Sequence, residues 1–110
     1  MTVKELTSFS EFQATINSGK AVLIDFYADW CGPCKSISPH FHQHSDTNAS
    51  TEGIEFYKVD VDKLPDVAQE CKIRAMPTFQ LYKNGERVAD MLGAKPTELT
   101  ALVQNGLALA

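Results

Sequence analysis

Two cysteines separated by two residues are the strongest chemical signal in this sequence. Cys31 and Cys34 enclose Gly32 and Pro33. Such a C-x-x-C pair has two common uses, as half of a zinc site or as a dithiol that cycles with a disulfide. Structural zinc usually needs a second close pair, whereas the third cysteine, Cys71, stands by itself in the sequence. The spacing therefore favours redox chemistry, and we expect no metal site.

The residues around the pair suit a reactive thiol. An apolar run precedes Cys31 and a helical pattern begins at or just before Cys34, so Cys31 is expected near a helix N-terminus. Backbone N–H groups and the positive end of the helix dipole stabilise a thiolate there, and the thiolate is the nucleophile of disulfide exchange. Gly32 is expected to allow a tight turn that Pro33 stiffens. These residues should hold the two sulfurs close enough to form a disulfide.

Asp25 places a carboxylate inside the most apolar run of the chain. Residues 21–28 read AVLIDFYA and are apolar on both faces, as in a central strand of a covered sheet. A buried carboxylate is costly unless its pKa rises or it is paired. Contact with water at a strand end is the alternative, but the apolar neighbours leave little room for it. Beside a dithiol, we therefore expect Asp25 to be functional.

Three histidines, His40, His42 and His44, follow the dithiol at alternate positions. Only His40 and His44 share a face of a helix, and nothing aims them at the thiols. We interpret the cluster as a solvated face; a metal-binding or pH-sensing role is the alternative, because histidine titrates near neutral pH. His44 falls at a core-facing position, and Ala49 is the one apolar residue of 42–53. This helix is therefore predicted to fray or end early.

Size and charge narrow the class of protein. The chain has 110 residues, 44% hydrophobic and 22% charged, so one domain spanning residues 1–110 is expected. The net charge is −4 and no basic cluster is present, which argues against nucleic-acid binding. No apolar run approaches the roughly 18 residues of a membrane span, and no secretory signal is visible. We expect a cytoplasmic location, with the nucleus as a second candidate compartment.

Strand-like and helix-like patterns alternate along the chain. Apolar runs predict strands at residues 3–6, 21–28, 54–61, 78–83 and 87–92. Helical spacing predicts helices from residue 8, from about residue 34, within 64–72 and over 95–107. Ser8 and Glu11 match a capping box, and Asn84-Gly85 matches a two-residue hairpin turn. The order β-α-β-α-β-α-β-β-α predicts an α/β fold whose mixed sheet of four or five strands has helices on both faces.

The motifs WCGPCK at residues 30–35 and MPTF at 76–79, with the apolar strand that carries Asp25, resemble the thioredoxin family. The similarity follows the order of strands and helices over nearly the whole chain. Gly85 and Gly93 also fall where the family has glycines. The resemblance implies a thioredoxin fold of the small, single-domain, cytosolic eukaryotic-like type. It implies a protein disulfide reductase acting in electron transport and cell redox homeostasis.

The resemblance also assigns roles in the reaction. It implies that Cys31 attacks a client disulfide and that Cys34 then resolves the mixed disulfide. Cys34 is expected to be the more buried thiol and therefore to need a base. Asp25 resembles the family's buried carboxylate, which takes that proton through water. Lys58 matches a lysine that tunes this carboxylate, and a solvated lysine at a sheet edge is the alternative.

Four residues are assigned to a client-binding surface by the same resemblance. Trp30 is expected to shield the dithiol and form part of that surface, with a place in the core as the alternative. Pro77 resembles the family's cis-proline beside the cysteines, although an ordinary trans bond is far commoner at X–Pro. The backbone of Met76 is expected to pair with an extended client segment. Gly93 is placed on the same surface.

The resemblance further implies an electron source and partners. No bound cofactor is expected: the redox group is the Cys31–Cys34 disulfide, recharged from NADPH by thioredoxin reductase. Expected clients are disulfide-containing proteins such as peroxiredoxins, methionine sulfoxide reductase and ribonucleotide reductase. A redox-gated binding module without catalysis and a protein disulfide isomerase-like domain are the alternatives. A resolving thiol with its own proton acceptor favours catalysis, and Pro33, where isomerases more typically carry His, favours a reductant.

Three positions depart from the family or have no assigned role. Tyr27 stands where many relatives carry Trp, and Asp29 adds a negative charge before the motif; both are expected to shift the potential or the choice of partner. Cys71 shares a helical face with Val67 and is expected to be a small buried hydrophobe. The alternative is a regulatory thiol that is oxidised or crosslinks two chains. We expect mainly a monomer.

Overall fold

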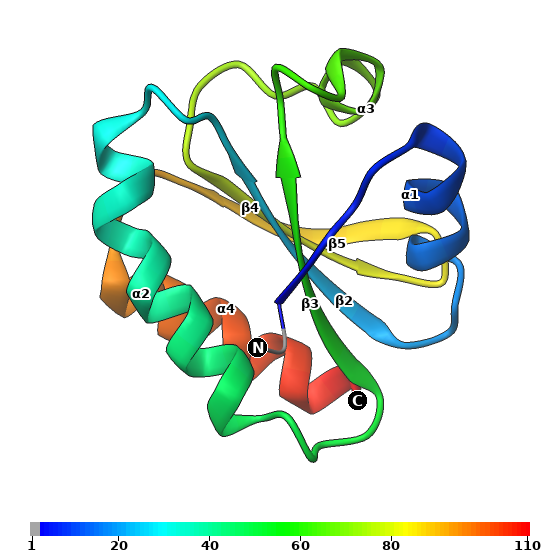
Figure 1. Ribbon diagram of the computed structural model, residues 1–110. Coiled ribbons are helices and arrows are strands. Elements are labelled where there is room, and N and C mark those ends of the chain that lie inside the picture. Colours follow the sequence, from blue (N-terminus) through cyan, green and yellow to red (C-terminus); the bar gives the residue numbers. More distant parts are fainter. Residues whose placement is uncertain (1–2) are drawn as a thin grey trace.

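The computed structural model describes residues 3–110, and its elements follow the predicted order (Figure 1). The strands in this part of the chain are β1 (Val3–Glu5), β2 (Ala21–Tyr27), β3 (Ile54–Asp60), β4 (Thr78–Lys83) and β5 (Glu86–Leu92). The helices are α1 (Phe9–Ile16), α2 (Gly32–Thr47), α3 (Pro65–Glu70) and α4 (Pro96–Leu109). None of the helices within residues 3–110 combines the length and apolarity that a membrane span requires.

The described strands form one mixed sheet of five in the order β1-β3-β2-β4-β5. The first three strands of that order run parallel, and β4 and β5 are antiparallel to their neighbours. Helices α2 and α4 cover one face of the sheet, and α1 and α3 lie on the other (Figure 1). The predicted mixed sheet with helices on both faces is confirmed.

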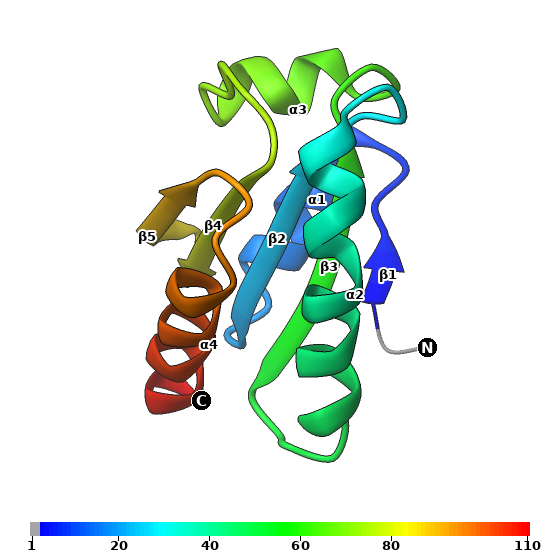
Figure 2. The ribbon, with the colours of Figure 1, turned by 90° about the vertical axis from the view of Figure 1, so that its left-hand side faces the viewer.

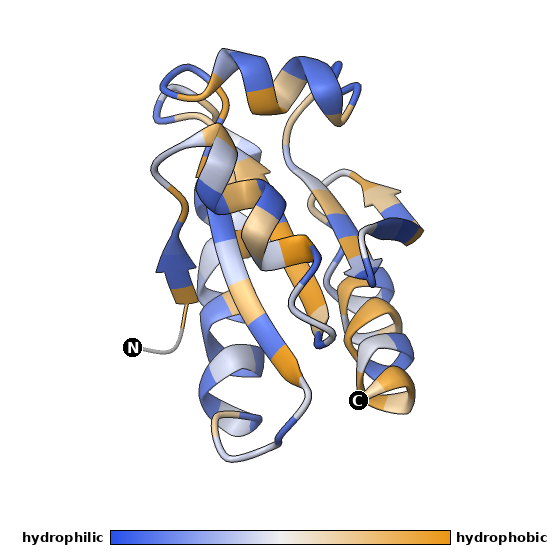
Figure 3. Cartoon of the chain, turned by 90° about the vertical axis from the view of Figure 1, so that its right-hand side faces the viewer, coloured by the Kyte–Doolittle hydropathy of each residue, from blue (hydrophilic) through white to orange (hydrophobic). Residues whose placement is uncertain are grey.

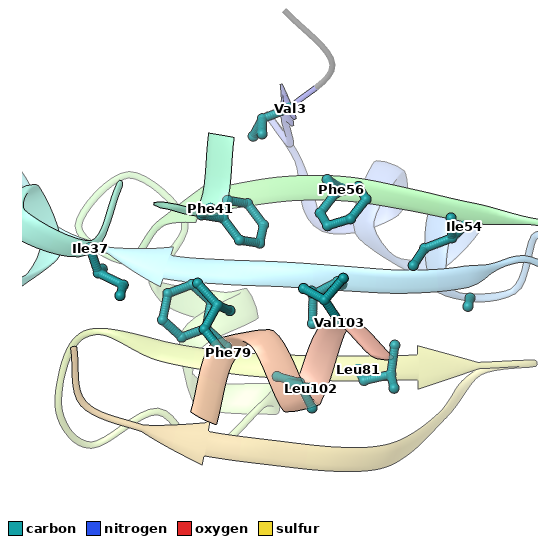
Figure 4. Packing of buried hydrophobic residues seen from close by; sticks show 12 residues of the cluster. Val3, Ile37, Phe41, Ile54, Phe56, Phe79, Leu81, Leu102 and Val103 are labelled. Carbon is teal, nitrogen blue, oxygen red and sulfur yellow. The ribbon is translucent and has the colours of Figure 1, made fainter. Parts of the chain in front are cut away.

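An aromatic cluster fixes the long helix α2 on the sheet. Phe41 of α2 lies with its ring centroid 5.6 Å from that of Phe56 and 5.5 Å from that of Phe79 (Figure 4). Helix α4 approaches the same face through Gly106, where an added Cβ would lie 3.0 Å from Cδ1 of Ile54. This packing holds the start of α2, and with it the cysteine pair, at the carboxyl end of β2.

Helix α1 begins as the sequence predicted, with one change in its capping box. The hydroxyl of Ser8 accepts the backbone N–H of Glu11 at 3.1 Å. The carboxylate of Glu11 accepts the backbone N–H of Thr7 at 2.7 Å, rather than that of Ser8. Both bonds occupy N–H groups that have no partner within the helix.

The prediction that α2 frays or ends early is wrong, since the helix runs to Thr47. Ser45, and not His44, takes the buried position, and its hydroxyl donates to the carbonyl oxygen of His42 at 2.7 Å. His44 turns toward α4, with Nε2 lying 3.3 Å from the hydroxyl oxygen of Thr100. Figure 3 shows that α2 is mostly hydrophilic in colour, whereas α4 has apolar bands. Tertiary packing along one face of α2 therefore outweighs its polar composition.

Candidate active site

The two cysteines are held at the first turn of α2 by the end of β2. Cys31 is the N-cap residue, and its backbone N–H donates to the carbonyl oxygen of Ala28 at 3.1 Å. The Cys31 and Cys34 sulfurs form a disulfide, with the two Cα atoms 5.3 Å apart. The backbone N–H of Cys34 points at Sγ of Cys31 at 3.2 Å. The same N–H and the helix dipole favour a thiolate on Cys31 once the disulfide is reduced.

Gly32 does not supply the tight turn that the sequence suggested. It is the first residue of α2 and its φ lies outside the left-handed region, so another residue can adopt this backbone. A Cβ built on Gly32 would meet nothing within 4 Å. Pro33 occupies the first turn of the helix, where its missing N–H costs no hydrogen bond. The glycine therefore leaves open space beside the disulfide instead of shaping it.

The two thiol positions differ in surroundings rather than in burial. Cys34 was expected to be the more buried, but the exposed fractions are 5% for Cys31 and 4% for Cys34. Both cysteines belong to one buried cluster with Ala28, against which Met76 and Val61 pack. The distinguishing feature is that Cys34 lines a cavity with Asp25.

Asp25 is a buried carboxylate that lines that cavity. It is 5% exposed, and its Oδ1 has no hydrogen-bond partner among the described residues. Burial raises the pKa of Asp25 from 3.8 to about 7, and the positive charge of Lys58 opposes this rise. The cavity, of about 160 Å³, is also lined by Tyr27 and by Lys58. It exceeds the volume of about 30 Å³ that one water molecule takes up in the liquid, so a water bridge between Asp25 and Cys34 has room.

Lys58 lies beside Asp25, with the two residues in register on the parallel strands β3 and β2. It is not at a sheet edge, because β1 pairs with the other side of β3. Its ammonium lies 4.0 Å from the carboxylate of Glu5 and 5.6 Å from the ring centre of Tyr27. The predicted closeness of Lys58 to the buried carboxylate is therefore observed.

Trp30 lies on the surface and not in the core, with 69% of it exposed. Its indole N–H donates to the carboxylate of Asp62 at 2.9 Å. Asp60, which is buried, accepts the backbone N–H of Asp62 at 2.9 Å and so orders the turn after β3. Neither aspartate is predicted from the sequence. The alternation of valine and aspartate in VDVD, at the end of a strand, was the available signal, but nothing in it pointed to Trp30.

The loop before β4 packs against the cluster that contains the disulfide. The Met76–Pro77 peptide bond is cis, as the resemblance implied. Met76 is half-buried against Cys31 and Cys34. Gly93, with φ +103°, donates its backbone N–H to the carbonyl oxygen of Pro77 at 2.9 Å. The chain around Cys31 and the turn at Gly93, more than sixty residues apart in the sequence, are thus connected through the loop of Met76 and Pro77.

Cys71, His40 and His44 lie apart from this assembly. Cys71 follows α3, is 3% exposed, and its Sγ lies 3.2 Å from the hydroxyl oxygen of Tyr82. Burial raises the pKa of the Cys71 thiol, so little thiolate forms near neutral pH. His40 is exposed and His44 faces α4. Within residues 3–110, no three His, Cys, Asp or Glu side chains gather as a metal would require.

Comparison with known proteins agrees with this geometry. The family model described as Thioredoxin matches residues 2–105. Thioredoxin of Coprinus comatus is 49% identical over 106 residues, which are 96% of this chain and 99% of that protein. Thioredoxin-2 of Pyricularia oryzae is 50% identical over 103 residues, 94% of this chain but 58% of that longer protein. The crystal structure of thioredoxin from Malassezia sympodialis superposes with a TM-score of 0.90 at 45% identity, covering 96% of this chain and 90% of that one.

Proposed function

The chain belongs to the thioredoxin family and is a protein disulfide reductase, and we propose that Cys31 attacks, Cys34 resolves and Asp25 accepts the Cys34 proton. The Cys31–Cys34 disulfide is the oxidised form of this dithiol. The observation that carries the proposed roles is the cavity that joins Cys34 to Asp25, whose carboxylate has an unpartnered oxygen. A resolving thiol with an adjacent base is the arrangement that disulfide exchange needs.

In the first step, the Cys31 thiolate attacks one sulfur of a client disulfide. The client S–S bond breaks, a mixed disulfide forms with Cys31, and the other client sulfur leaves as a thiolate that takes a proton from solvent. The helix N-terminus and the N–H of Cys34 stabilise the attacking thiolate. Gly32 leaves room for the client to reach the sulfur, and Pro33 fixes the first turn of the helix.

In the second step, Cys34 gives its proton to Asp25 and attacks Sγ of Cys31. The mixed disulfide breaks, the second client sulfur leaves as a thiolate that takes a proton from solvent, and two electrons have passed from the dithiol to the client. Burial raises the pKa of Asp25 to about 7, so near neutral pH the carboxylate both accepts and releases this proton. Lys58 tunes that balance, because its positive charge favours the carboxylate.

Client docking is proposed for the surface around the disulfide. Trp30 offers an exposed indole, held by Asp62. Met76 packs against the cluster with the disulfide, and Gly93 supports the loop of Met76 and Pro77 through a backbone hydrogen bond. An extended client segment is proposed to pair with the backbone of Met76.

Electron supply and clients follow from the family. Thioredoxins carry no bound cofactor and work with a reductase and with disulfide-containing clients. We propose that the electrons come from NADPH through thioredoxin reductase. Peroxiredoxins, methionine sulfoxide reductase and ribonucleotide reductase are proposed as clients. Electrophoresis of trapped mixed disulfides, followed by mass spectrometry, identifies which of these the protein meets.

Domain organisation and location are also proposals. We propose that residues 1–110 act as one domain and mainly as a monomer, a view supported by the single sheet that joins residues 3–92. A cytoplasmic location, with the nucleus as a second compartment, is proposed from the sequence. Cell fractionation with an antibody checks the location, and sedimentation of the purified protein checks that it is mainly a monomer.

A non-catalytic, redox-gated binding module is the function to be excluded by experiment. The wild type should reduce insulin disulfides in the presence of dithiothreitol, read as precipitation of the insulin B chain. Cys34→Ser should lose turnover and accumulate a mixed disulfide with insulin. Mass spectrometry should show this as the mass of one covalently attached insulin chain. The matched Cys31→Ser variant should trap far less. Absence of turnover by the wild type, or equal trapping by both variants, contradicts the proposed reductase roles.

A further inference from the structure

A row of three charged residues crosses the sheet beneath α2. Glu5 on β1 is in register with Lys58 on β3, and Lys58 is in register with Asp25 on β2. Figure 2 shows β1, β3 and β2 side by side, with α2 in front of them. Residues paired across a sheet point to the same face, so Lys58 has one carboxylate on each side.

Contacts on the β1 side engage both oxygens of the Glu5 carboxylate. Oε1 lies 4.0 Å from Nζ of Lys58, and Oε2 accepts the hydroxyl of Tyr27 at 2.6 Å. The ammonium of Lys58 also lies 5.6 Å from the ring centre of Tyr27, where a cation is attracted by the aromatic face. Burial and then the bond to Glu5 raise the pKa of Tyr27, so its hydroxyl stays a donor near neutral pH.

Contacts on the β2 side are fewer. Oδ1 of Asp25 has no hydrogen-bond partner within residues 3–110. The influence of Lys58 on Asp25 is the attraction of a nearby charge, and burial outweighs it. The ammonium is therefore held toward the partly exposed carboxylate and away from full pairing with the buried one.

We propose that Glu5 is a positioning residue for the proton-acceptor site: with Tyr27 it holds the Lys58 ammonium on the β1 side and limits how strongly that charge stabilises the Asp25 carboxylate. The catalytic consequence of this inference rests on the proposed role of Asp25 as proton acceptor. The charge arrangement itself does not depend on that role. Glu5 never touches the reacting sulfurs and acts through Lys58.

The indirect route is stronger than the direct one. Glu5 and Asp25 are separated by two strand spacings, about 10 Å, which exceeds the screening length of about 8 Å at physiological ionic strength. Lys58 lies between them and can move by rotation of its flexible side chain. Removing the Glu5 charge therefore releases the ammonium toward Asp25, which favours the carboxylate and lowers the pKa of Asp25.

Other charged or titratable groups face this site, and their protonation can also affect the titration of Asp25. The cavity is also lined by Asp29, by Lys35 and by Cys34, whose thiol titrates in the reduced protein. From α2, His42 lies close enough that the Lys58 charge contributes to its lowered pKa, after burial. Measuring the oxidised protein first removes the Cys34 thiol from the coupled titration.

The test follows the Asp25 carboxyl carbon by NMR through a pH titration of the oxidised protein at low salt. Glu5→Gln should lower the pKa of Asp25 by roughly 0.5 to 1. Tyr27→Phe should also lower the pKa of Asp25, but by a smaller amount, because Glu5 then loses its hydroxyl partner. Glu55→Gln is the matched control: Glu55 lies on β3 and pairs with Lys20 at 3.1 Å, so the pKa of Asp25 should stay unchanged.

A double variant isolates the route through Lys58. In a Lys58→Met background, Glu5→Gln should no longer shift the Asp25 titration; Lys58→Gln serves the same purpose if the methionine variant does not fold. An unchanged or raised pKa in Glu5→Gln overturns the proposal, and so does a shift that persists without Lys58. In the reduced protein, the acid limb of the resolution rate should move to lower pH with Glu5→Gln. If the NMR shift is present and Asp25→Asn leaves resolution unaffected, the catalytic role of Asp25 fails while the positioning by Glu5 stands.

Discussion

The backbone N–H of Gly93 donates to the carbonyl oxygen of Pro77 at 2.9 Å and joins the turn after β5 to the residue that precedes β4. Gly93 adopts φ +103°, a conformation that residues with a Cβ rarely take. Pro77 follows Met76, which packs on the disulfide. One hydrogen bond therefore connects a conformational requirement at residue 93 to the shape of the loop beside the cysteines.

Gly93→Ala should destabilise the protein, and Gly32→Ala should not. An alanine at Gly93 meets the Lys95 side chain only at an ordinary distance of 3.5 Å, so the cost comes from the backbone, about 1–2 kcal/mol. Gly32 has no such backbone requirement, and a change within about 0.5 kcal/mol is expected there. Urea unfolding of the two variants gives the comparison. A loss at Gly93 no larger than that at Gly32 would contradict the backbone cost assigned to Gly93.

Asp25→Asn should stabilise the fold at neutral pH and slow resolution of the mixed disulfide. The folded-state pKa of about 7 lies above the ordinary 3.8, so the protonated form is favoured in the fold. The stability present below about pH 4 is lost as pH rises through 7. Three pKa units at about 1.4 kcal/mol each give a loss on the order of 4 kcal/mol. Denaturation at pH 4 and pH 8 should show the gain from Asn only at the higher pH, and a gain that is equal at both contradicts the burial effect.

His44→Leu should remove a loss of stability at mildly acidic pH without changing insulin reduction. Burial, and then the charge of His40, lowers the pKa of His44 below 6.5. The neutral form is therefore favoured in the fold, and stability is lost as pH falls from 6.5 through the lowered value. Thermal unfolding at pH 8 and pH 5.5 measures this difference. Gln43→Leu, at an exposed and uncharged position of the same helix, is the control and should keep the wild-type pH dependence.

Cys71 should be the slowest of the three thiols to react in the reduced protein. Burial raises the pKa of the Cys71 thiol and outweighs the Tyr82 hydroxyl, which donates to the sulfur and lowers that pKa, so the thiolate stays scarce. Alkylation with iodoacetamide, read by mass spectrometry, should label Cys31 first and Cys71 only on unfolding. Cys71→Ala should leave insulin reduction unchanged and cost stability through the lost contacts. Rapid labelling of Cys71 in the folded protein, or a Cys71-linked dimer formed under mild oxidant, would support the regulatory alternative.

The chemistry of the site could be predicted because it lies in short segments of the chain. The C-x-x-C spacing, the apolar run around Asp25 and the turn signal at Asn84-Gly85 each act through neighbours in sequence, and the structure has a disulfide, a buried carboxylate and a hairpin at these places. Periodicity and capping likewise fix the type and order of the elements, since these depend on local backbone hydrogen bonds.

The tertiary structure decided the features that depend on contacts between residues far apart in the sequence. The polar second half of α2 stays helical because its Ser45 side packs against the sheet, which composition could not reveal. Cys31 and Cys34 are equally buried, in a cluster against which Met76 and Val61 pack from more than twenty-five residues away in the sequence.

The sequence by itself determined the reactive groups, the order of the elements and the family, because those are encoded in residue types and short spacings. Only the fold decided that Glu5, Lys58 and Asp25 form one row, since the row is made by strand pairing across more than fifty residues. Only the fold joined Trp30 to Asp62, through a turn whose direction the sequence does not display. Electrostatic tuning of a buried acid depends on distances in space, and distances between strands are set by the sheet.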